Sequence, residues 1–133
     1  MLFFFRFGDL SNYFCTFAGR KDKISSMTTE RKQQILQAIR QKAKEITPKG
    51  SEIILFGSQA RGDAHDGSDW DVLILIDKDR VTSDDMDEYS YPLREMGWDY
   101  NECINPMLFT KKEWQQNIAS PFYENVLHDG IKL

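Results

Sequence analysis

The hydrophobic positions after residue 27 follow two different periods along the chain. Between residues 28 and 46, apolar side chains recur every three or four positions, which is the spacing of one face of an α-helix. Pro48 and Gly50 follow and are expected to end this helix. Two short continuous apolar runs, residues 53–56 and 72–76, predict strands that are covered on both faces.

A polar segment separates the second strand from the next helix. Thr82 and Ser83 precede an acid-rich first turn, which is typical of a solvated helix start. Pro92 is expected to kink or split this helix before Gly97 closes it.

The last third of the chain predicts one more strand and two short helices. Residues 103–109 indicate a strand at the sheet edge or with a bulge, because Pro106 has no amide hydrogen. Thr110 begins a capping box, and Ser120 followed by proline opens a helix that Gly130 ends. The predicted order is helix, strand, glycine loop, strand, helix, strand, helix, helix.

The length of 133 residues indicates one domain, which we place at residues 27–133. Residues 1–26 differ from the rest because they hold six of the nine phenylalanines without a helical or alternating period. We expect them to be a poorly ordered extension, or upstream sequence assigned before a true start at Met27.

Charge and composition exclude several classes of function. A net charge of −4 and a pI near 5.2 argue against a protein that coats DNA or an acidic membrane. No apolar run approaches the ~20 residues of a membrane helix. Cys15 and Cys103 lack the spacing of a zinc site and indicate no disulfide framework, so we expect a cytoplasmic protein.

Two carboxylates, Asp69 and Asp71, open the second strand. Residues two apart in a strand face the same side, so these acids project together and Trp70 projects the other way. Their repulsion is costly unless a cation lies between them. Oxygen ligands without a nearby cysteine favour a hard ion such as Mg²⁺.

The glycine loop before these acids has the residues of an anion site. Gly57 follows the first strand directly and allows close approach of a ligand, while Ser58 offers an amide and a hydroxyl. Arg61 adds a charged fork suited to phosphate oxygens. Glycine, serine and aspartate are also common turn residues, so a polar hairpin loop without function is the alternative.

The segment FGSQARGDAHDGSDWDVLI resembles the signature of the DNA polymerase β-type nucleotidyltransferase superfamily in its minimal, single-domain form. The resemblance implies an α/β (α+β) fold, a nucleotidyltransferase-like mixed β-sheet of about three to five strands flanked by helices. It also implies metal-dependent transfer of a nucleotide from a triphosphate, ATP or another nucleoside triphosphate, with two Mg²⁺ ions.

The resemblance assigns roles to individual residues. It implies that Gly57 and Ser58 hold the β- and γ-phosphates, that Arg61 and Ser68 support the phosphates from the loop, and that Asp69 and Asp71 ligate the metals.

The superfamily usually has a third acid on the next strand, and this sequence departs from that pattern. Glu102 is the nearest candidate for this metal ligand and Asp99 the next. A one-residue slip of the strand would instead present Cys103 and Asn105 on that face. Without an acid there, nucleotide binding survives while transfer becomes slow or absent.

Minimal members of this superfamily are often antitoxins whose partner is a helical toxin of the HEPN type. The resemblance therefore implies transfer of AMP from ATP to a hydroxyl, with a tyrosine of such a toxin as acceptor. The alternative is a catalytically impaired, nucleotide-binding antitoxin that acts by protein contact. We expect no membrane association and no direct DNA binding.

Overall fold

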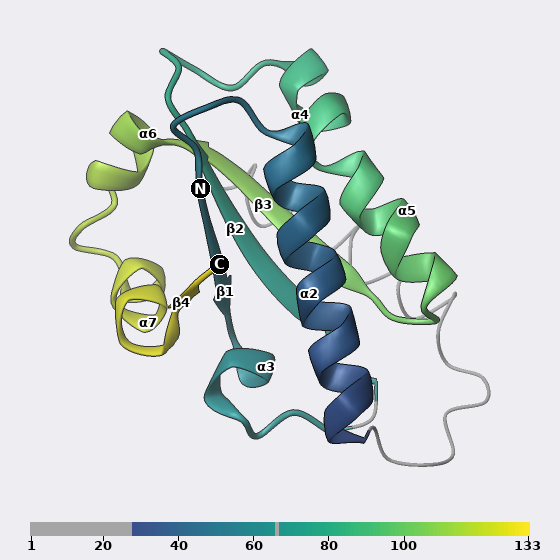
Figure 1. Cartoon of the computed structure of the whole chain (residues 1–133). Helices are drawn as coiled ribbons and strands as arrows, with labels where there is room; N and C mark the ends of the chain where they lie inside the picture. Colours follow the sequence, from purple (N-terminus) through teal and green to yellow (C-terminus); the bar gives the residue numbers. More distant parts are fainter. Residues whose placement is uncertain (1–27, 66) are drawn as a thin grey trace.

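The computed structural model describes residues 28–65 and 67–133, so the predicted extension at residues 1–26 lies outside the described residues. Within them, the first helix, α2, spans Thr29–Ile46 and is capped by Thr28, whose hydroxyl accepts from the Arg31 amide. The predicted helix at residues 28–46 is confirmed, and it lies across the sheet (Figure 1).

Four strands form one mixed sheet in the order β3-β2-β1-β4. They are β1 (Glu52–Phe56), β2 (Trp70–Ile76), β3 (Ile104–Thr110) and β4 (Ile131–Lys132). Strand β1 is antiparallel to β2 and β4, whereas β2 and β3 are parallel. The predicted mixed sheet flanked by helices is therefore confirmed; β4 was not predicted, because two residues carry no period.

The coverage of the strands follows their place in the sheet. All five residues from Val72 to Ile76 are buried, which confirms that β2 is covered on both faces. In β1 burial alternates, and Ile54 and Phe56 are only partly buried. Strand β3 lies at the sheet edge, which confirms the position expected for Pro106.

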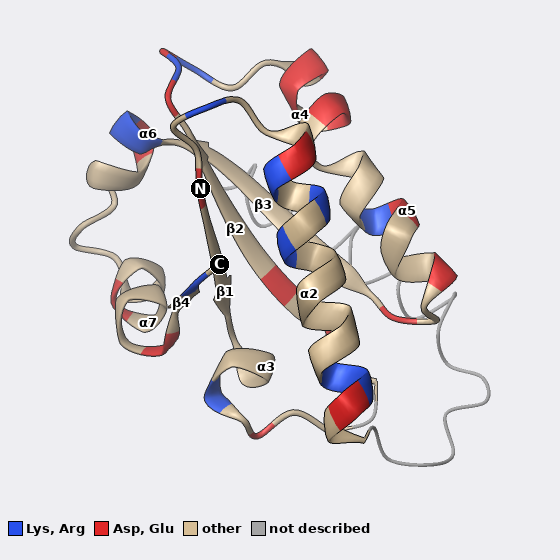
Figure 2. Ribbon diagram, in the orientation of Figure 1, with Lys and Arg blue, Asp and Glu red and all other residues tan. Residues whose placement is uncertain are grey.

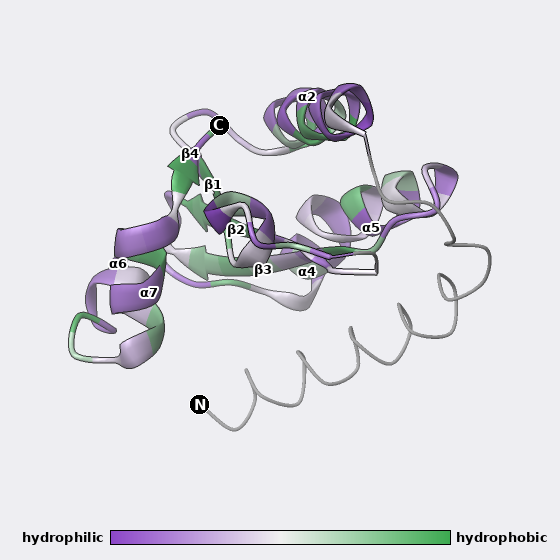
Figure 3. Cartoon of the chain, turned by 90° about the horizontal axis from the view of Figure 1, so that it is seen from below, coloured by the Kyte–Doolittle hydropathy of each residue, from purple (hydrophilic) through white to green (hydrophobic). Residues whose placement is uncertain are grey.

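Helices cover both faces of the sheet (Figure 3). On one face, α2 and α5 (Tyr91–Asp99) pack against alternate strand residues, and on the other face α6 (Lys111–Gln115) and α7 (Pro121–Asp129) pack against the residues between them. The first core includes Ile35, Ile39, Trp70, Val72, Ile74, Ile76 and Leu93, and the second Leu73, Leu75, Met107, Trp114 and Val126.

The predicted split at Pro92 is confirmed. Helix α4 (Ser83–Tyr89) ends at Ser90, and α5 begins directly after it with Pro92 in its first turn. The acidic start of α4 is a capping box on Thr82, and Figure 2 shows acidic residues gathered on this helix. The capping box of Thr110 on α6 is confirmed as well.

Gly97 does not close α5, contrary to the prediction, because the helix continues to Asp99. A Cβ at Gly97 would lie 3.0 Å from both the Glu102 carbonyl oxygen and Ile104 Cγ1. The glycine therefore allows α5 to pack closely on the start of β3. The chain turns instead at Asn101, whose φ is 58°.

Two further expectations concern membranes and cysteines. Of the helices in the described part of the chain, none combines the length and the apolar character that a bilayer crossing requires. Cys15, one of the two cysteines, lies outside the described residues, so the expectation about disulfides stays a prediction.

The buried centre of β2 should dominate stability. We expect Ile74→Ala to lower the free energy of unfolding by about 2–5 kcal/mol, because Ile74 is 0% exposed and its loss leaves a cavity. Leu127→Ala on α7, where the side chain is 70% exposed, is the matched control and should stay within about 0.5 kcal/mol of wild type. Urea denaturation of both variants measures the difference, and equal losses would contradict this account.

Candidate functional site

The end of β1 brings the backbone against an acidic side chain of β2. Gly57 follows the strand with φ 79° and ψ −160°, a conformation that L-residues rarely adopt. A Cβ at this position would overlap Asp71 Oδ2 and lie 3.3 Å from Asp71 Cγ. Only glycine therefore lets the chain pass this close to the carboxylate.

The glycine loop begins with one turn of helix, α3 (Ser58–Arg61), which the sequence pattern did not predict. The Gly57 carbonyl accepts from the amides of Ala60 and Arg61 at 3.0 Å, and the Ser58 carbonyl accepts from the Gly62 amide at 2.9 Å. Ser58 thus sits in a fixed backbone turn directly beside Gly57. This argues against a hairpin loop with no fixed form.

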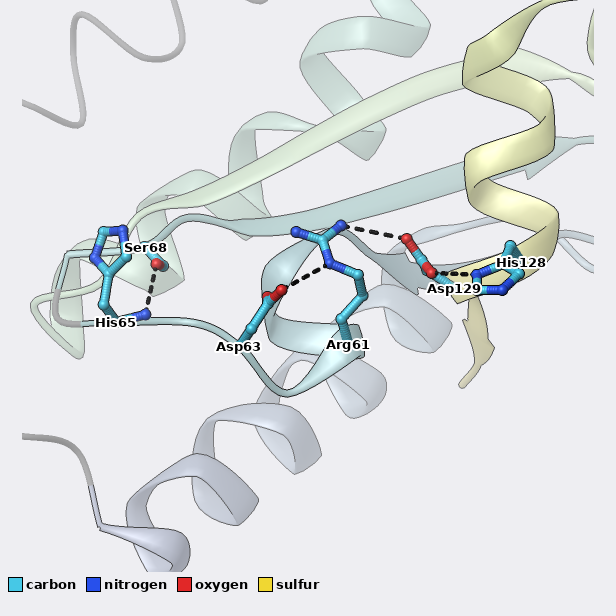
Figure 4. A network of polar contacts seen from close by, with 6 residues as sticks. All are labelled: Arg61, Asp63, His65, Ser68, His128 and Asp129. Carbon is cyan, nitrogen blue, oxygen red and sulfur yellow. Dashed lines mark hydrogen bonds and ion pairs between the residues drawn. The ribbon is translucent and has the colours of Figure 1, made fainter.

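A second turn precedes the aspartates. Ser68 Oγ accepts from the His65 amide at 2.9 Å, and the Ser68 amide donates to the His65 carbonyl at the same distance (Figure 4). Gln59 Nε2 donates to the Ser68 carbonyl at 3.4 Å, which links α3 to this turn. In this structure the Ser68 hydroxyl holds the loop, and this positions the residue after it, Asp69.

Asp69 directly precedes β2 and Asp71 is its second residue, and the charge of Asp71 acts on Asp69. Trp70 between them is buried in the core beneath α2. Burial is the main cause that raises the pKa of Asp69 to about 6, and the neighbouring Asp71 carboxylate raises it further. Burial also raises the pKa of Asp71, against the hydrogen bond from Asn105 and the charge of Arg61, which lower it. The pair is therefore poised to take up a cation.

Arg61 connects the loop to the end of the chain (Figure 4). Its Nε donates to Asp63 Oδ2 at 3.1 Å and its Nη1 to Asp129 Oδ2 at 3.2 Å. Asp129, at the end of α7, also contacts His128 Nδ1 at 2.8 Å. The guanidinium is close enough to Asp71 to lower its pKa, so a fixed positive charge borders the two carboxylates.

The structure does not bring Glu102 to the aspartates. Glu102 is buried, and its Oε1 accepts from the indole nitrogen of Trp70 at 3.1 Å. Because Trp70 projects away from Asp69 and Asp71, Glu102 lies on the opposite side of the sheet. Asp99, the next candidate, is an exposed residue at the end of α5.

Asn105 occupies the place beside Asp71 on β3. The parallel register pairs Asp71 with Asn105, and Asn105 Nδ2 donates to Asp71 Oδ1 at 3.2 Å. This is the register in which Asn105, and not Glu102, shares the face of the aspartates. Among the described residues no group of three histidine, cysteine or acidic side chains is placed to hold a metal.

The donor set nevertheless fits a hard divalent cation. It comprises two carboxylates that repel each other and the side-chain oxygen of Asn105, which is buried without a hydrogen-bond partner. Gly57 and Ser58 leave backbone and hydroxyl groups beside these ligands, and Arg61 supplies charge for an anion. The arrangement suits a metal ion together with phosphate groups.

Comparison with known proteins identifies the family to which this chain belongs. The sequence model of the nucleotidyltransferase domain family matches residues 32–127, and the chain belongs to this family. A Methanocaldococcus jannaschii protein, provisionally named protein adenylyltransferase, is 30% identical over 104 residues, which cover 75% of this chain and 99% of that protein. The chain is thus a nucleotidyltransferase-family protein, and the superfamily resemblance of its sequence is confirmed.

One solved structure is similar at a greater distance. It is the crystal structure of a toxin-antitoxin with AMP-PNP, with a TM-score of 0.49 and 19% sequence identity. The similar region covers 76% of this chain and 70% of that chain. Similarity at this level adds nothing to the assignment of this chain.

Sequence reasoning missed two residues of the site as it stands. Asn105 was named only as the outcome of a shifted register, since nothing local in the strand distinguishes its face from that of Glu102. Asp129 was not named at all, because it lies 68 residues from Arg61 and carries no motif. Its position next to the histidine at the end of the last helix was the only available signal.

A methyl group at Gly57 should disrupt the site more than the fold. Gly62→Ala places alanine in the left-handed region, which costs about 1–2 kcal/mol of stability, whereas Gly57→Ala places it at φ 79° and ψ −160°, a region essentially restricted to glycine, at about 1–3 kcal/mol. Only at Gly57 does the new Cβ meet Asp71, whereas nothing lies within 4 Å of it at Gly62. We expect Gly57→Ala alone to lose binding of Mg²⁺ with ATP, measured by calorimetry. Similar binding by both variants would contradict this role for Gly57.

The raised pKa of Asp69 predicts how stability changes with pH. The folded protein keeps a proton that the unfolded chain releases between pH 3.8 and about 6, so stability falls as pH rises through that window. Without metal at about pH 7.5, Asp69→Asn should therefore be more stable than wild type. The difference should be on the order of 1 kcal/mol, a value discounted for the solvent-exposed part of the carboxyl.

Urea denaturation in EDTA at about pH 7.5 and about pH 3.5 measures this, and the difference should vanish at the lower pH. A difference that is the same at both pH values would contradict a burial-raised pKa at Asp69.

Proposed function

We propose that this protein transfers a nucleoside monophosphate, AMP from ATP, to a hydroxyl group on another protein, with Mg²⁺ bound by Asp69 and Asp71. The observation that carries the proposal is the contact between Gly57 and Asp71, in which a glycine turn lies directly against an acid whose charge acts on Asp69. Membership of the nucleotidyltransferase family supports the reaction class.

Each part of the site has a task in this reaction. Gly57 and Ser58 bind the β- and γ-phosphates through the fixed turn at the start of α3, and Arg61 faces the same charge. Ser68 holds the turn that positions Asp69. Asp69 and Asp71 would hold two Mg²⁺ ions, and when bound these would supply charge neutralisation for the attacking and leaving oxygens.

The reaction forms one bond and breaks one. The acceptor oxygen bonds to the α-phosphorus, the bond between that phosphorus and the bridging oxygen breaks, and pyrophosphate leaves with the electron pair. The acceptor hydroxyl passes its proton to solvent water, because no third carboxylate faces Asp71. Positioning by the loop and the neutralised charge provide most of the rate in this class of transfer.

A protein acceptor is supported by the relative named protein adenylyltransferase. The resemblance to minimal nucleotidyltransferases adds a partner, a helical toxin of the HEPN type whose tyrosine takes the nucleotide. Such a partner would present its hydroxyl beside Asp71, at the end of β1 where Gly57 lies.

The second candidate is a nucleotide-binding antitoxin that neutralises its partner by contact. It is favoured by one observation: Asn105, not a carboxylate, faces Asp71. A site with two acids binds metal and triphosphate, while the acceptor's proton has no third carboxylate to receive it. The two candidates differ in whether label from the α-phosphate becomes covalently attached.

The deciding experiment incubates the protein with Mg²⁺, α-labelled ATP and the candidate partner encoded beside it. We expect labelled partner with wild type and a loss of at least about 100-fold with Asp71→Asn, since a metal ligand is removed. Asp84→Asn, on the exposed start of α4, is the matched control and should label as wild type does. Equal labelling by Asp71→Asn would refute the assignment, and binding without labelling in wild type would select the second candidate.

A further inference from the structure

The most unusual side chain of the site is Asn105. It is 8% exposed, and its Nδ2 donates to Asp71 Oδ1 at 3.2 Å. Its Oδ1 is buried without a hydrogen-bond partner. A buried amide oxygen without a hydrogen-bond partner destabilises the folded protein, so its presence requires an explanation.

The orientation of the amide follows from its neighbour. If the group were turned over, Oδ1 would face the Asp71 carboxylate and two acceptors would meet without a proton between them. The hydrogen bond to Asp71 therefore holds Nδ2 in place and leaves Oδ1 as the free oxygen. An amide oxygen is a neutral ligand that hard divalent cations accept.

The negative charge of the site determines how many divalent cations it binds with high affinity. The bound triphosphate supplies much of the negative charge that attracts the ions, and Asp69 and Asp71 add two charges from the protein when ionised. A carboxylate at position 105 would add a third charge, whereas the amide adds an oxygen without charge. Because affinity for hard cations depends on the number of charged ligands, a second ion loses much of its attraction here.

We propose that Asn105 is the third ligand position of this site and that, as a neutral ligand, it makes the site hold one divalent ion tightly and a second one weakly. The inference rests on the proposed function, since it assumes a nucleotide-bound metal site at Asp69 and Asp71. On this proposal, the two aspartates are sufficient to bind the nucleotide together with the first divalent ion, while residue 105 sets the affinity for the second ion.

The test counts ions directly. The full chain with a non-hydrolysable ATP analogue is titrated with Mn²⁺, and bound ion is measured by electron paramagnetic resonance. Wild type should bind one Mn²⁺ per chain tightly and a second at least about 10-fold more weakly. Asn105→Asp should tighten the second ion at least about 10-fold and leave the first within about threefold.

A second variant removes the ligand oxygen. Asn105→Leu has a similar size and should lose the second ion while it keeps the first. Both replacements remove the Nδ2 donor from Asp71, so circular dichroism first checks that each variant is folded, and Asn105→Asp carries the test if the leucine variant is not. A merely structural role for Asn105 would leave the affinity of both ions unchanged in a folded leucine variant.

Three results are decisive. Two ions of equal affinity in wild type, or no change of the second ion in Asn105→Asp, would overturn the inference about Asn105. If wild type binds neither Mn²⁺ nor the analogue and Asp71→Asn behaves identically, the proposed function fails. If wild type binds one ion in an Asp71-dependent way, the proposed function stands and only the variants at position 105 decide the inference.

Discussion

The structure of this site depends on how closely β1 and β2 approach each other at one end of the sheet. The antiparallel register pairs Phe56 with Asp71, so the residue after the strand reaches the carboxylate, and only a glycine fits there. This contact joins the turn that can bind phosphate to the acids that can bind a cation. The burial that produces the contact also raises the pKa values of both aspartates, so the free site carries unfavourable charge.

The core residues beneath α2 and the polar residues of the candidate site lie on opposite faces of the sheet. Trp70, Val72, Ile74 and Ile76 pack under α2, and Glu102 joins that side through its hydrogen bond to Trp70. The acids and Asn105 occupy the other face, which α6 and α7 cover further along the strands. The carboxylate of Glu102, two residues before β3, is thus present in the chain, but it is bonded to Trp70 of the core.

Sequence patterns predict the elements of this fold correctly where the determining residues lie within a few positions of one another. The apolar runs of β1 and β2, the capping boxes at Thr82 and Thr110, and the proline that splits α4 from α5 all act within a few residues, and each was predicted. The register of β3 was not, because a shift by one residue exchanges Glu102 for Asn105 and only the packing of the whole sheet fixes it. The prediction that Gly97 ends its helix is wrong for the same reason, because this glycine is needed for close packing on the start of β3.

The ion pair of Arg61 with Asp129 has a consequence for how the protein is made. Its two partners lie 68 residues apart, and the strand β4 that follows Asp129 pairs with β1. On a translating ribosome, the arginine beside the glycine turn emerges long before the aspartate that holds it. The contact between Arg61 and Asp129 therefore forms only late in synthesis, after the last helix has emerged.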